Sequence, residues 1–247
     1  MVVNLVNYAL TLKFNGSAYC GWQVQKNALS VQEVLQNAVE YVFKKRLGIT
    51  GCSRTDSGVH ANEYVCHIQA APEFDLARLP LAINSHLPKD IAVLSAKTID
   101  DTFHARYDAN GKEYVYKIWN SRIHNPFFTD TAFHYPKIID IEKASKITGE
   151  FVGKHDFASF MASHSKIEDT VREIWYFKAE REGDFVNFIV AADGFLYNMV
   201  RIMCGTILHC LRGHITLPIS AIIEAKDRNL AGATLPPHGL YLNRIFY

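Results

Sequence analysis

The chain lacks any long uninterrupted apolar run and any large excess of one charge. Charged residues break its apolar stretches well short of the roughly 20 residues that a membrane-spanning helix needs, and the opening MVVNLVNYAL contains no basic leader. We therefore expect no membrane association and a place in the cytoplasm. The formal net charge is only +1, so any affinity for nucleic acid must come from a local basic surface.

Cysteine is sparse and is not arranged in pairs. The five cysteines are an odd number and include no C-x-x-C pair, which argues against a disulfide framework and against a zinc knuckle. Cys204, His209 and Cys210 are metal-ligand types, but the two cysteines fall mainly on the apolar side of a predicted helix. A Gly-rich nucleotide fingerprint is also absent from the sequence. We predict neither a bound metal nor a cofactor.

What remains is the composition of an ordinary globular protein that is long enough for two domains. Of the 247 residues, 49% are hydrophobic and 21% are charged, which is typical of a chain that buries a core. The hydrophobic pattern lapses between Thr98 and Asn110. We place a domain boundary there, and predict domains of residues 1–105 and 106–247.

Hydrophobic periodicity predicts the same mixture of elements in both halves. In the first half it indicates strands over residues 8–14, 63–69 and 91–96, and helices that begin after Ser30 and at Pro80. In the second half it indicates strands over 112–119, 172–180, 185–192 and 240–247, and helices over 140–151 and 196–211. A Glu-Gly-Asp turn joins two of these strands as an antiparallel hairpin. We predict an α+β fold of two similar domains, each a mainly antiparallel sheet with packed helices, and expect the site in a cleft between them.

The most informative polar stretch covers residues 53–61, between a strong helix and a strand. Loops held by rigid flanks often carry catalytic residues. The plainer interpretation is a surface turn in which Asp56 caps backbone amides, Gly58 supplies an unusual dihedral angle and Arg54 makes a local ion pair. On chemistry alone, the surface turn is the favoured interpretation.

Several motifs, however, resemble those of one enzyme family. The segment R-T-D-x-G-V-H-A around Asp56 resembles the signature of the tRNA pseudouridine synthase A family, and residues 14–23 resemble its opening F-x-G-x-x-Y-x-G-W-Q. Further blocks follow in the family's order, at residues 112–116, 155–160, 170–172, 195–201 and 237–242. The resemblance spans essentially the whole chain. One departure is Cys52-Ser53, where the family commonly has Ala-Gly; a serine at positive φ would cost about 1 kcal/mol.

The resemblance implies an enzyme that isomerises uridine to pseudouridine in tRNA. The bond from uracil N1 to ribose C1′ breaks, the base turns, and C1′ rejoins at C5. Asp56 is implied as the catalytic carboxylate; it could attack C1′, attack the uracil ring or remove a sugar proton, and the sequence leaves these routes open. The resemblance also implies a homodimer that acts on the anticodon stem-loop, at the expected positions 38–40 of tRNA.

The same resemblance draws attention to further site residues. An ionised carboxylate in a dry pocket needs a cationic partner, and we predict Arg201, at the edge of an apolar helix stripe, for this role. Arg54 is a second partner or a contact to RNA phosphate. Tyr114 resembles the family's active-site tyrosine, which offers a ring face and a hydroxyl. Tyr116 should share its sheet face and could exchange roles with it, while Leu242 is expected to form an apolar wall under the base.

A paired uridine must also be flipped out of its stem, at a cost of a few kcal/mol that phosphate contacts and stacking offset. The basic candidates for these contacts are Arg106, Lys112, Arg172 and Arg244. Two other hypotheses stay open. A non-catalytic RNA-binding protein of the same fold, such as a tRNA-folding chaperone, would make Asp56 dispensable. A metal-dependent transferase with Asp56 as phosphoryl acceptor would need clustered carboxylates or a phosphate-cradling Gly loop, and neither is evident near Asp56.

Overall fold

A computed structural model of the chain describes residues 5–71, 74–163 and 167–247. The chain divides into two compact units, the first comprising Met1–Asn110 and Leu242–Tyr247 and the second Gly111–Tyr241. The boundary predicted from the sequence lies at residue 105, with the C-terminal strand in the second domain. Within the described residues, no helix is both long and apolar enough to cross a membrane.

The first unit is built on a β-sheet. Its strands are β1 (Val6–Phe14), the two-residue β2 (Thr50–Gly51), β3 (His60–Ala70), β4 (Ile91–Ile99) and β10 (Leu240–Phe246). Their order is β4-β1-β3-β10, with β2 on β3, and the pairs among β1, β2, β3 and β4 are antiparallel. Every second residue of β1 from Tyr8 to Phe14 is buried, as the period-two pattern predicted.

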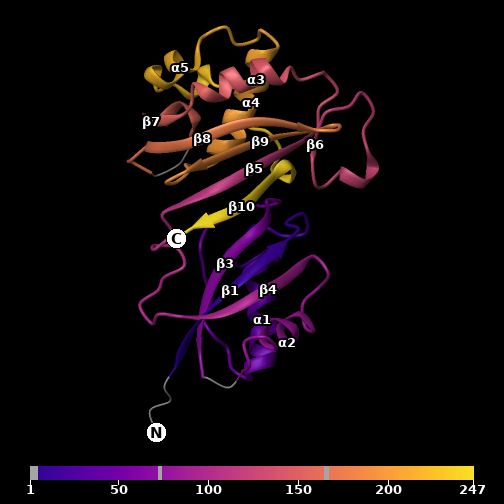
Figure 1. The fold of residues 1–247 in the computed structure, drawn as a ribbon, viewed down its shortest axis with the longest axis vertical. Helices are drawn as coiled ribbons and strands as arrows, with labels where there is room; N and C mark the ends of the chain where they lie inside the picture. The colour runs from indigo at the N-terminus through magenta and orange to yellow at the C-terminus, as the bar shows by residue number, and fades with distance from the viewer. Residues whose placement is uncertain (1–4, 72–73, 164–166) are drawn as a thin grey trace. The chain divides into compact units, whose positions relative to one another are not determined.

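Two helices pack beside each other in this unit, α1 (Val31–Phe43) and α2 (Leu79–Asn84) (Figure 1). The α1 helix begins where the sequence predicted, because the Ser30 side chain accepts a hydrogen bond from the Glu33 amide at 3.3 Å. It ends at Lys44, which adopts left-handed backbone angles with φ of 54°. The predicted apolar stripe is buried at Val31, Leu35, Ala38 and Val39.

The second unit has a sheet of similar construction. Its strands are β5 (Gly111–Trp119), β6 (Phe133–His134), β7 (Gly153–Asp156), β8 (Val171–Glu182) and β9 (Phe185–Ala192). The order is β5-β9-β8-β7 with antiparallel neighbours, and β6 adds to β5 in parallel. The predicted hairpin is β8–β9, and Gly183 supplies a φ of +57° in its turn. Each unit therefore combines a mainly antiparallel sheet with helices, which is the α+β class.

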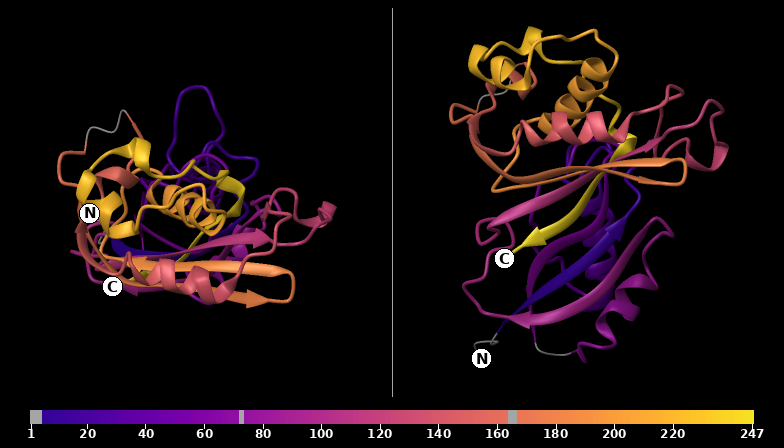
Figure 2. Two further views of the ribbon diagram at one scale, coloured as in Figure 1. Left: turned by 90° about the horizontal axis from the view of Figure 1, so that it is seen from above. Right: turned by 45° about the horizontal axis from the view of Figure 1, so that its top comes forward.

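Helices α3 (Ile141–Gly149), α4 (Met199–Leu211) and α5 (Ile219–Ala225) lie on one side of the β5-β9-β8 sheet (Figure 2). The α4 helix begins three residues later than the apolar stripe predicted, because Asn198 has a left-handed φ of 60° and starts the helix after a turn. The sequence analysis did not predict α5, the short strands β2, β6 and β7, or the 3-10 turns Pro126–Phe128, Ala158–Phe160, Arg228–Leu230 and Pro237–Gly239.

Candidate active site

The turn that carries Asp56 lies between β2 and β3 and is held by the loop that follows β1. The Trp22 amide donates to the Thr55 carbonyl at 3.1 Å, and the Gly58 amide donates to the Tyr19 carbonyl at 3.2 Å. The opening motif and the R-T-D-x-G-V-H-A motif are therefore packed against each other. These backbone bonds fix the course of the turn independently of its side chains.

Glycine makes this close packing possible. Gly21 has a φ of +82°, and a Cβ added there would lie 2.3 Å from the Thr55 carbonyl oxygen. A Cβ at Gly16 would lie 2.0 Å from the Val59 carbonyl oxygen. Real atoms cannot approach so closely, so both loops meet backbone to backbone only because these positions lack a side chain.

The family departure at Ser53 costs no backbone strain. Among the described residues, the non-glycine residues with positive φ are Lys44, Asn198 and Lys226, and Ser53 is not one of them. The buried Tyr64 hydroxyl donates to the Ser53 carbonyl and accepts from its amide at 3.4 Å. Tyr64 thereby fixes the first residue of the turn.

The first unit contains three of the predicted site residues. Asp56 is half-buried and Arg54 is exposed, whereas Leu242 is fully buried. Among the residues the structure describes, Arg54 makes no ion pair, so the local pair of the surface-turn interpretation is not formed. Beside Asp56, the buried Thr55 hydroxyl has no hydrogen-bond partner in the described parts of the chain.

The second unit contains Arg201, in the first turn of α4. Its Nε donates to the Leu235 carbonyl and its Nη1 donates to Asn198 Oδ1, both at 2.6 Å. A guanidinium is planar, so these two bonds fix its orientation. The Leu235 amide in turn donates to the Arg201 carbonyl at 3.3 Å.

Two glycines bring the segment before Leu235 against α4. A Cβ at Gly205 would lie 1.9 Å from the Ala233 carbonyl oxygen, and one at Gly232 would lie 2.6 Å from the Thr206 amide nitrogen. The Gly232 amide donates to the Thr206 hydroxyl at 2.8 Å. The carbonyl that receives Arg201 is therefore placed by direct backbone contact with the helix.

The two tyrosines of β5 differ in what their side chains do. Tyr114 is 8% exposed and packs edge-on against Phe195, with ring centroids 5.2 Å apart. Tyr116 is fully buried, and its hydroxyl donates to the Pro236 carbonyl at 2.8 Å. Burial raises the pKa of Tyr116 well above its ordinary value. Since its hydroxyl bonds to the backbone, Tyr116 has a structural role, and Tyr114 is the better candidate for contact with substrate.

The histidine of the Pro237-His238-Gly239 block lies near the same arginine. Burial lowers the pKa of His238 below its ordinary value; nearby Asp130 raises this pKa and Arg201 lowers it. A Cβ at Gly239 would lie 2.7 Å from the Tyr116 ring. The block therefore packs against Tyr116.

The four predicted phosphate contacts fall in different surroundings. Arg106 is exposed in the first unit, and Arg244, also exposed, lies over the Phe246 ring at 5.2 Å. Lys112 is half-buried on β5, opposite Ala192 of β9. Arg172 folds back on its own strand: its Nη1 donates to the carbonyls of Val171 and Asp169, and only 19% of its side chain is exposed. Arg172 is therefore less available for RNA than the exposed Arg106 and Arg244.

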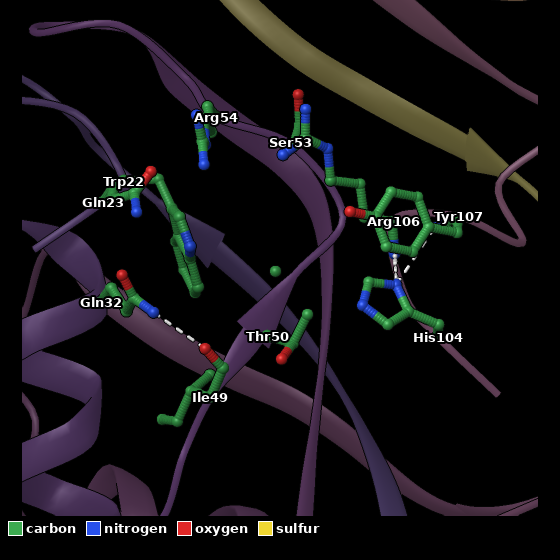
Figure 3. A pocket seen from close by; sticks show the side chains of 11 residues that line it. Trp22, Gln23, Gln32, Ile49, Thr50, Ser53, Arg54, His104, Arg106 and Tyr107 are labelled. Carbon is green, nitrogen blue, oxygen red and sulfur yellow. Dashed lines mark hydrogen bonds between the residues drawn. The ribbon is translucent and has the colours of Figure 1, made fainter. Parts of the chain in front are cut away.

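A pocket of about 210 Å³ lies beside the Asp56 turn, entirely within the first unit (Figure 3). Its walls come from the loop after β1, the start of α1, β2, the first residues of the turn and the segment after β4. Figure 3 shows the Trp22 ring along one wall, with His104 and Tyr107 on the opposite side. The lining residues are Trp22, Gln23, Gln32, Ile49, Thr50, Gly51, Ser53, Arg54, His104, Arg106 and Tyr107.

Sequence reasoning gave no role to two residues that the structure places at these sites. Trp22 lines the pocket, and Asn198 both starts α4 and holds Arg201. Both lie inside motifs quoted above, which was the only signal available. Their roles depend on the fold that surrounds them.

Another of these motifs is structural. Asp156 forms an ion pair with Lys226 at 2.7 Å and accepts hydrogen bonds from the Thr170 hydroxyl and the Ala158 amide. The buried Ser159 hydroxyl donates to the Ile222 carbonyl at 2.6 Å. Blocks 155–160 and 170–172 therefore tie β7, β8 and α5 together.

The cysteines are all free thiols, three of them buried. Burial raises the pKa of the Cys66 and Cys204 thiols above their ordinary values, so these thiols are protonated at neutral pH. In the parts of the chain that the structure describes, no group of three or more His, Cys, Asp or Glu side chains could hold a metal ion.

Comparison with known proteins gives consistent matches along the chain. A family model described as tRNA pseudouridine synthase matches residues 11–108 and 147–247, which include Asp56 and Arg201 but not Tyr114. A tRNA pseudouridine synthase A of Thermoanaerobacter sp. (strain X514) is 41% identical over 242 residues, or 98% of this chain and 99% of that relative. One of Ruminiclostridium cellulolyticum is 40% identical over 96% of this chain and 98% of that relative. One of Bacillus pumilus is 39% identical over 96% and 97%, respectively.

Proposed function

Because this chain belongs to the tRNA pseudouridine synthase family and isomerises uridine to pseudouridine in tRNA, we propose that Asp56 is the carboxylate that performs the reaction. The proposal is based on how the turn holds Asp56. Asp56 is half-buried in a loop fixed by backbone bonds to the opening motif, and a reacting group must be held in one place to act. Two motifs of the family therefore converge on this residue.

The reaction imposes two requirements on the Asp56 carboxylate. It must be ionised, and it must reach either the sugar or the uracil ring while the N1–C1′ bond breaks and the C1′–C5 bond forms. The hydrogen on C5 leaves as a proton and N1 gains one, so nothing is oxidised or hydrolysed overall. The three routes open to Asp56 share this proton balance.

We further propose roles in the reaction for Arg201 and Tyr114. Arg201 carries a permanent charge that would keep a neighbouring carboxylate ionised, and its orientation is supported by bonds to Leu235 and Asn198. Tyr114 would offer its ring to the target base and its hydroxyl to a proton. Arg54, exposed and without an ion pair among the described residues, would bind RNA phosphate, and Leu242 would form an apolar wall.

The family resemblance supports a more specific proposal for the substrate and the oligomeric state. We propose that the enzyme acts in the cytoplasm as a homodimer on uridines of the anticodon stem-loop, at positions 38–40 of tRNA. With a net charge of +1, binding would depend on a few arginines and lysines near the site. Affinity should therefore fall steeply with salt.

Release of tritium from tRNA labelled at uracil C5 tests the proposal, because the C5 hydrogen is lost in every route. We expect wild type to release tritium in the presence of chelator, and Asp56→Asn to be slower by at least about a thousandfold. Asp101→Asn, an exposed aspartate of the same unit, is the matched control and should behave as wild type. Equal release by wild type and Asp56→Asn would refute the catalytic role and favour another carboxylate.

A further inference from the structure

The pocket beside the Asp56 turn is lined by Trp22, whose indole N–H is a hydrogen-bond donor. The Trp22 side chain is only 3% exposed and stacks on Tyr64, with ring centroids 4.1 Å apart. Its indole N–H has no acceptor among residues 5–71, 74–163 and 167–247. The N–H is therefore available to an acceptor that enters the pocket.

The indole nitrogen lies on the pocket side of the ring. Gly51 lines the pocket, and a Cβ added at Gly51 would lie 2.6 Å from Trp22 Nε1. Glycine at this position therefore keeps the approach to the nitrogen open. A ligand oxygen entering the pocket would meet an N–H donor that is already fixed by stacking.

The charge of the lining indicates what kind of ligand carries that oxygen. Arg54 and Arg106 both line the pocket, and none of the lining residues is acidic. Neither arginine side chain makes an ion pair or hydrogen bond within the described part of the chain. Two unpaired guanidinium groups and an N–H donor form a site for an anion with several acceptor oxygens, such as a phosphate group.

The wall opposite Trp22 adds an aromatic surface (Figure 3). The rings of His104 and Tyr107 are stacked with centroids 4.2 Å apart and planes 25° apart, and Tyr107 is 76% exposed. The amides of Arg106 and Tyr107 both donate to His104 Nδ1 at 3.2 Å, and the His104 amide donates to Asp108 at 2.8 Å. These bonds hold the His104 ring and the backbone of Arg106 and Tyr107 in place before any ligand arrives.

We propose that this pocket binds a second nucleotide of the tRNA, separate from the uridine that reacts. Its phosphate would lie between Arg54 and Arg106 with an oxygen on the Trp22 N–H, and its base would stack on Tyr107. At about 210 Å³ the pocket is smaller than the roughly 300–1,000 Å³ that encloses a drug-sized ligand, which suits one residue of a longer strand. The inference rests on the proposed function, because it assumes that tRNA is bound at the Asp56 turn.

The first test observes the Trp22 N–H directly by NMR. The chain contains three tryptophans, so the ¹⁵N-labelled protein gives three indole signals, and Trp22→Phe identifies one of them. Addition of unmodified tRNA transcript to Asp56→Asn, used to prevent turnover, should shift the Trp22 signal downfield. An unmoved Trp22 signal at saturating tRNA would overturn the proposal, as would a shift produced by inorganic phosphate but not by RNA.

The second test measures tRNA affinity by fluorescence anisotropy over a series of salt concentrations. Arg106→Gln should weaken binding about tenfold and lower the slope of log K against log salt by about one. Tyr107→Ala should weaken binding by at least about fivefold and leave that slope unchanged. Arg78→Gln is the matched control, because Arg78 is exposed in the same unit and pairs only loosely with Asp75 at 3.8 Å; it should stay within about twofold of wild type.

The two proposals fail in different ways. If wild type releases tritium and Asp56→Asn does not, but Arg106→Gln and Tyr107→Ala bind tRNA like Arg78→Gln, the second-nucleotide pocket is refuted and the proposed catalytic residue stands. If tritium release is the same in wild type and Asp56→Asn, the catalytic proposal fails. The Trp22 signal and the Arg106 salt slope would still report on the pocket.

Discussion

At the scale of single residues, we expect one tyrosine of β5 to contribute to stability and the other to contribute to the reaction. Tyr116→Phe leaves the half-buried Pro236 carbonyl without its donor, and we expect a loss of about 1 kcal/mol in the free energy of unfolding. Tritium release per folded molecule should be unchanged. Tyr114→Phe should instead slow tritium release by at least about tenfold, since its hydroxyl is proposed to handle a proton.

Urea unfolding and tritium release, measured on both variants, check this pair of expectations. The substitution is chemically the same in the two proteins, so each serves as the control for the other. If Tyr116→Phe slows release and Tyr114→Phe does not, the two roles must be exchanged.

Some properties of single site residues cannot be predicted from the sequence. The chemistry around Asp56 favoured an ordinary surface turn, and only the longer motif pointed to catalysis. Trp22 is an aromatic residue in the opening motif, and nothing in the sequence says that its N–H lacks an acceptor. That property depends on Gly51 and Tyr64, which the fold brings to it from other strands.

At the scale of elements, the contact between two loops determines the shape of the Asp56 turn. Gly21→Ala would place a methyl group 2.3 Å from the Thr55 carbonyl at a φ of +82°. We expect it to lower the free energy of unfolding by at least about 2 kcal/mol and to slow tritium release, because the turn must move. Chemical unfolding and the tritium assay measure the two effects.

A second glycine isolates the effect of the backbone angle. Gly213 has a φ of +69°, and a Cβ there would meet nothing within 4 Å. Gly213→Ala should therefore cost only about 1 kcal/mol and leave tritium release unchanged. Equal effects of the two substitutions would show that the close approach at Gly21 is unimportant.

Elements were predictable in proportion to their length. The sequence correctly predicts β1, α1 and the hairpin β8–β9. Their hydrophobic patterns repeat over several turns or residue pairs, and a capping box also marks the start of α1. Strands as short as β2 and β6 contain two residues each and show no period. The start of α4 was misplaced because Asn198 adopts a left-handed angle that hydrophobicity does not encode.

At the scale of the whole molecule, the first unit includes the distant segment Leu242–Tyr247. Leu242 and Ile245 are buried, the Ile245 amide donates to Glu63 at 3.3 Å, and the Asn110 amide donates to the Phe246 carbonyl at 2.8 Å. Deletion of residues 242–247 removes this burial and should destabilise the first unit by at least about 3 kcal/mol.

Hydrogen exchange of the β3 amides, compared between full-length and truncated chains, measures this loss. Arg244→Gln is the control, because Arg244 is exposed on the same strand and its replacement should leave exchange unchanged. Equal protection of β3 in the truncated chain would mean that β10 contributes little to the sheet.

The place of β10 next to β3 has a consequence during synthesis on the ribosome. All of the second unit except its last two residues is translated between β4 and β10. The sheet of the first unit therefore stays incomplete on the ribosome until the end of the chain has been made. An unpaired strand edge is a template for aggregation. The emerging polypeptide therefore depends on rapid completion or on a chaperone, and an expressed fragment that stops after residue 110 should precipitate.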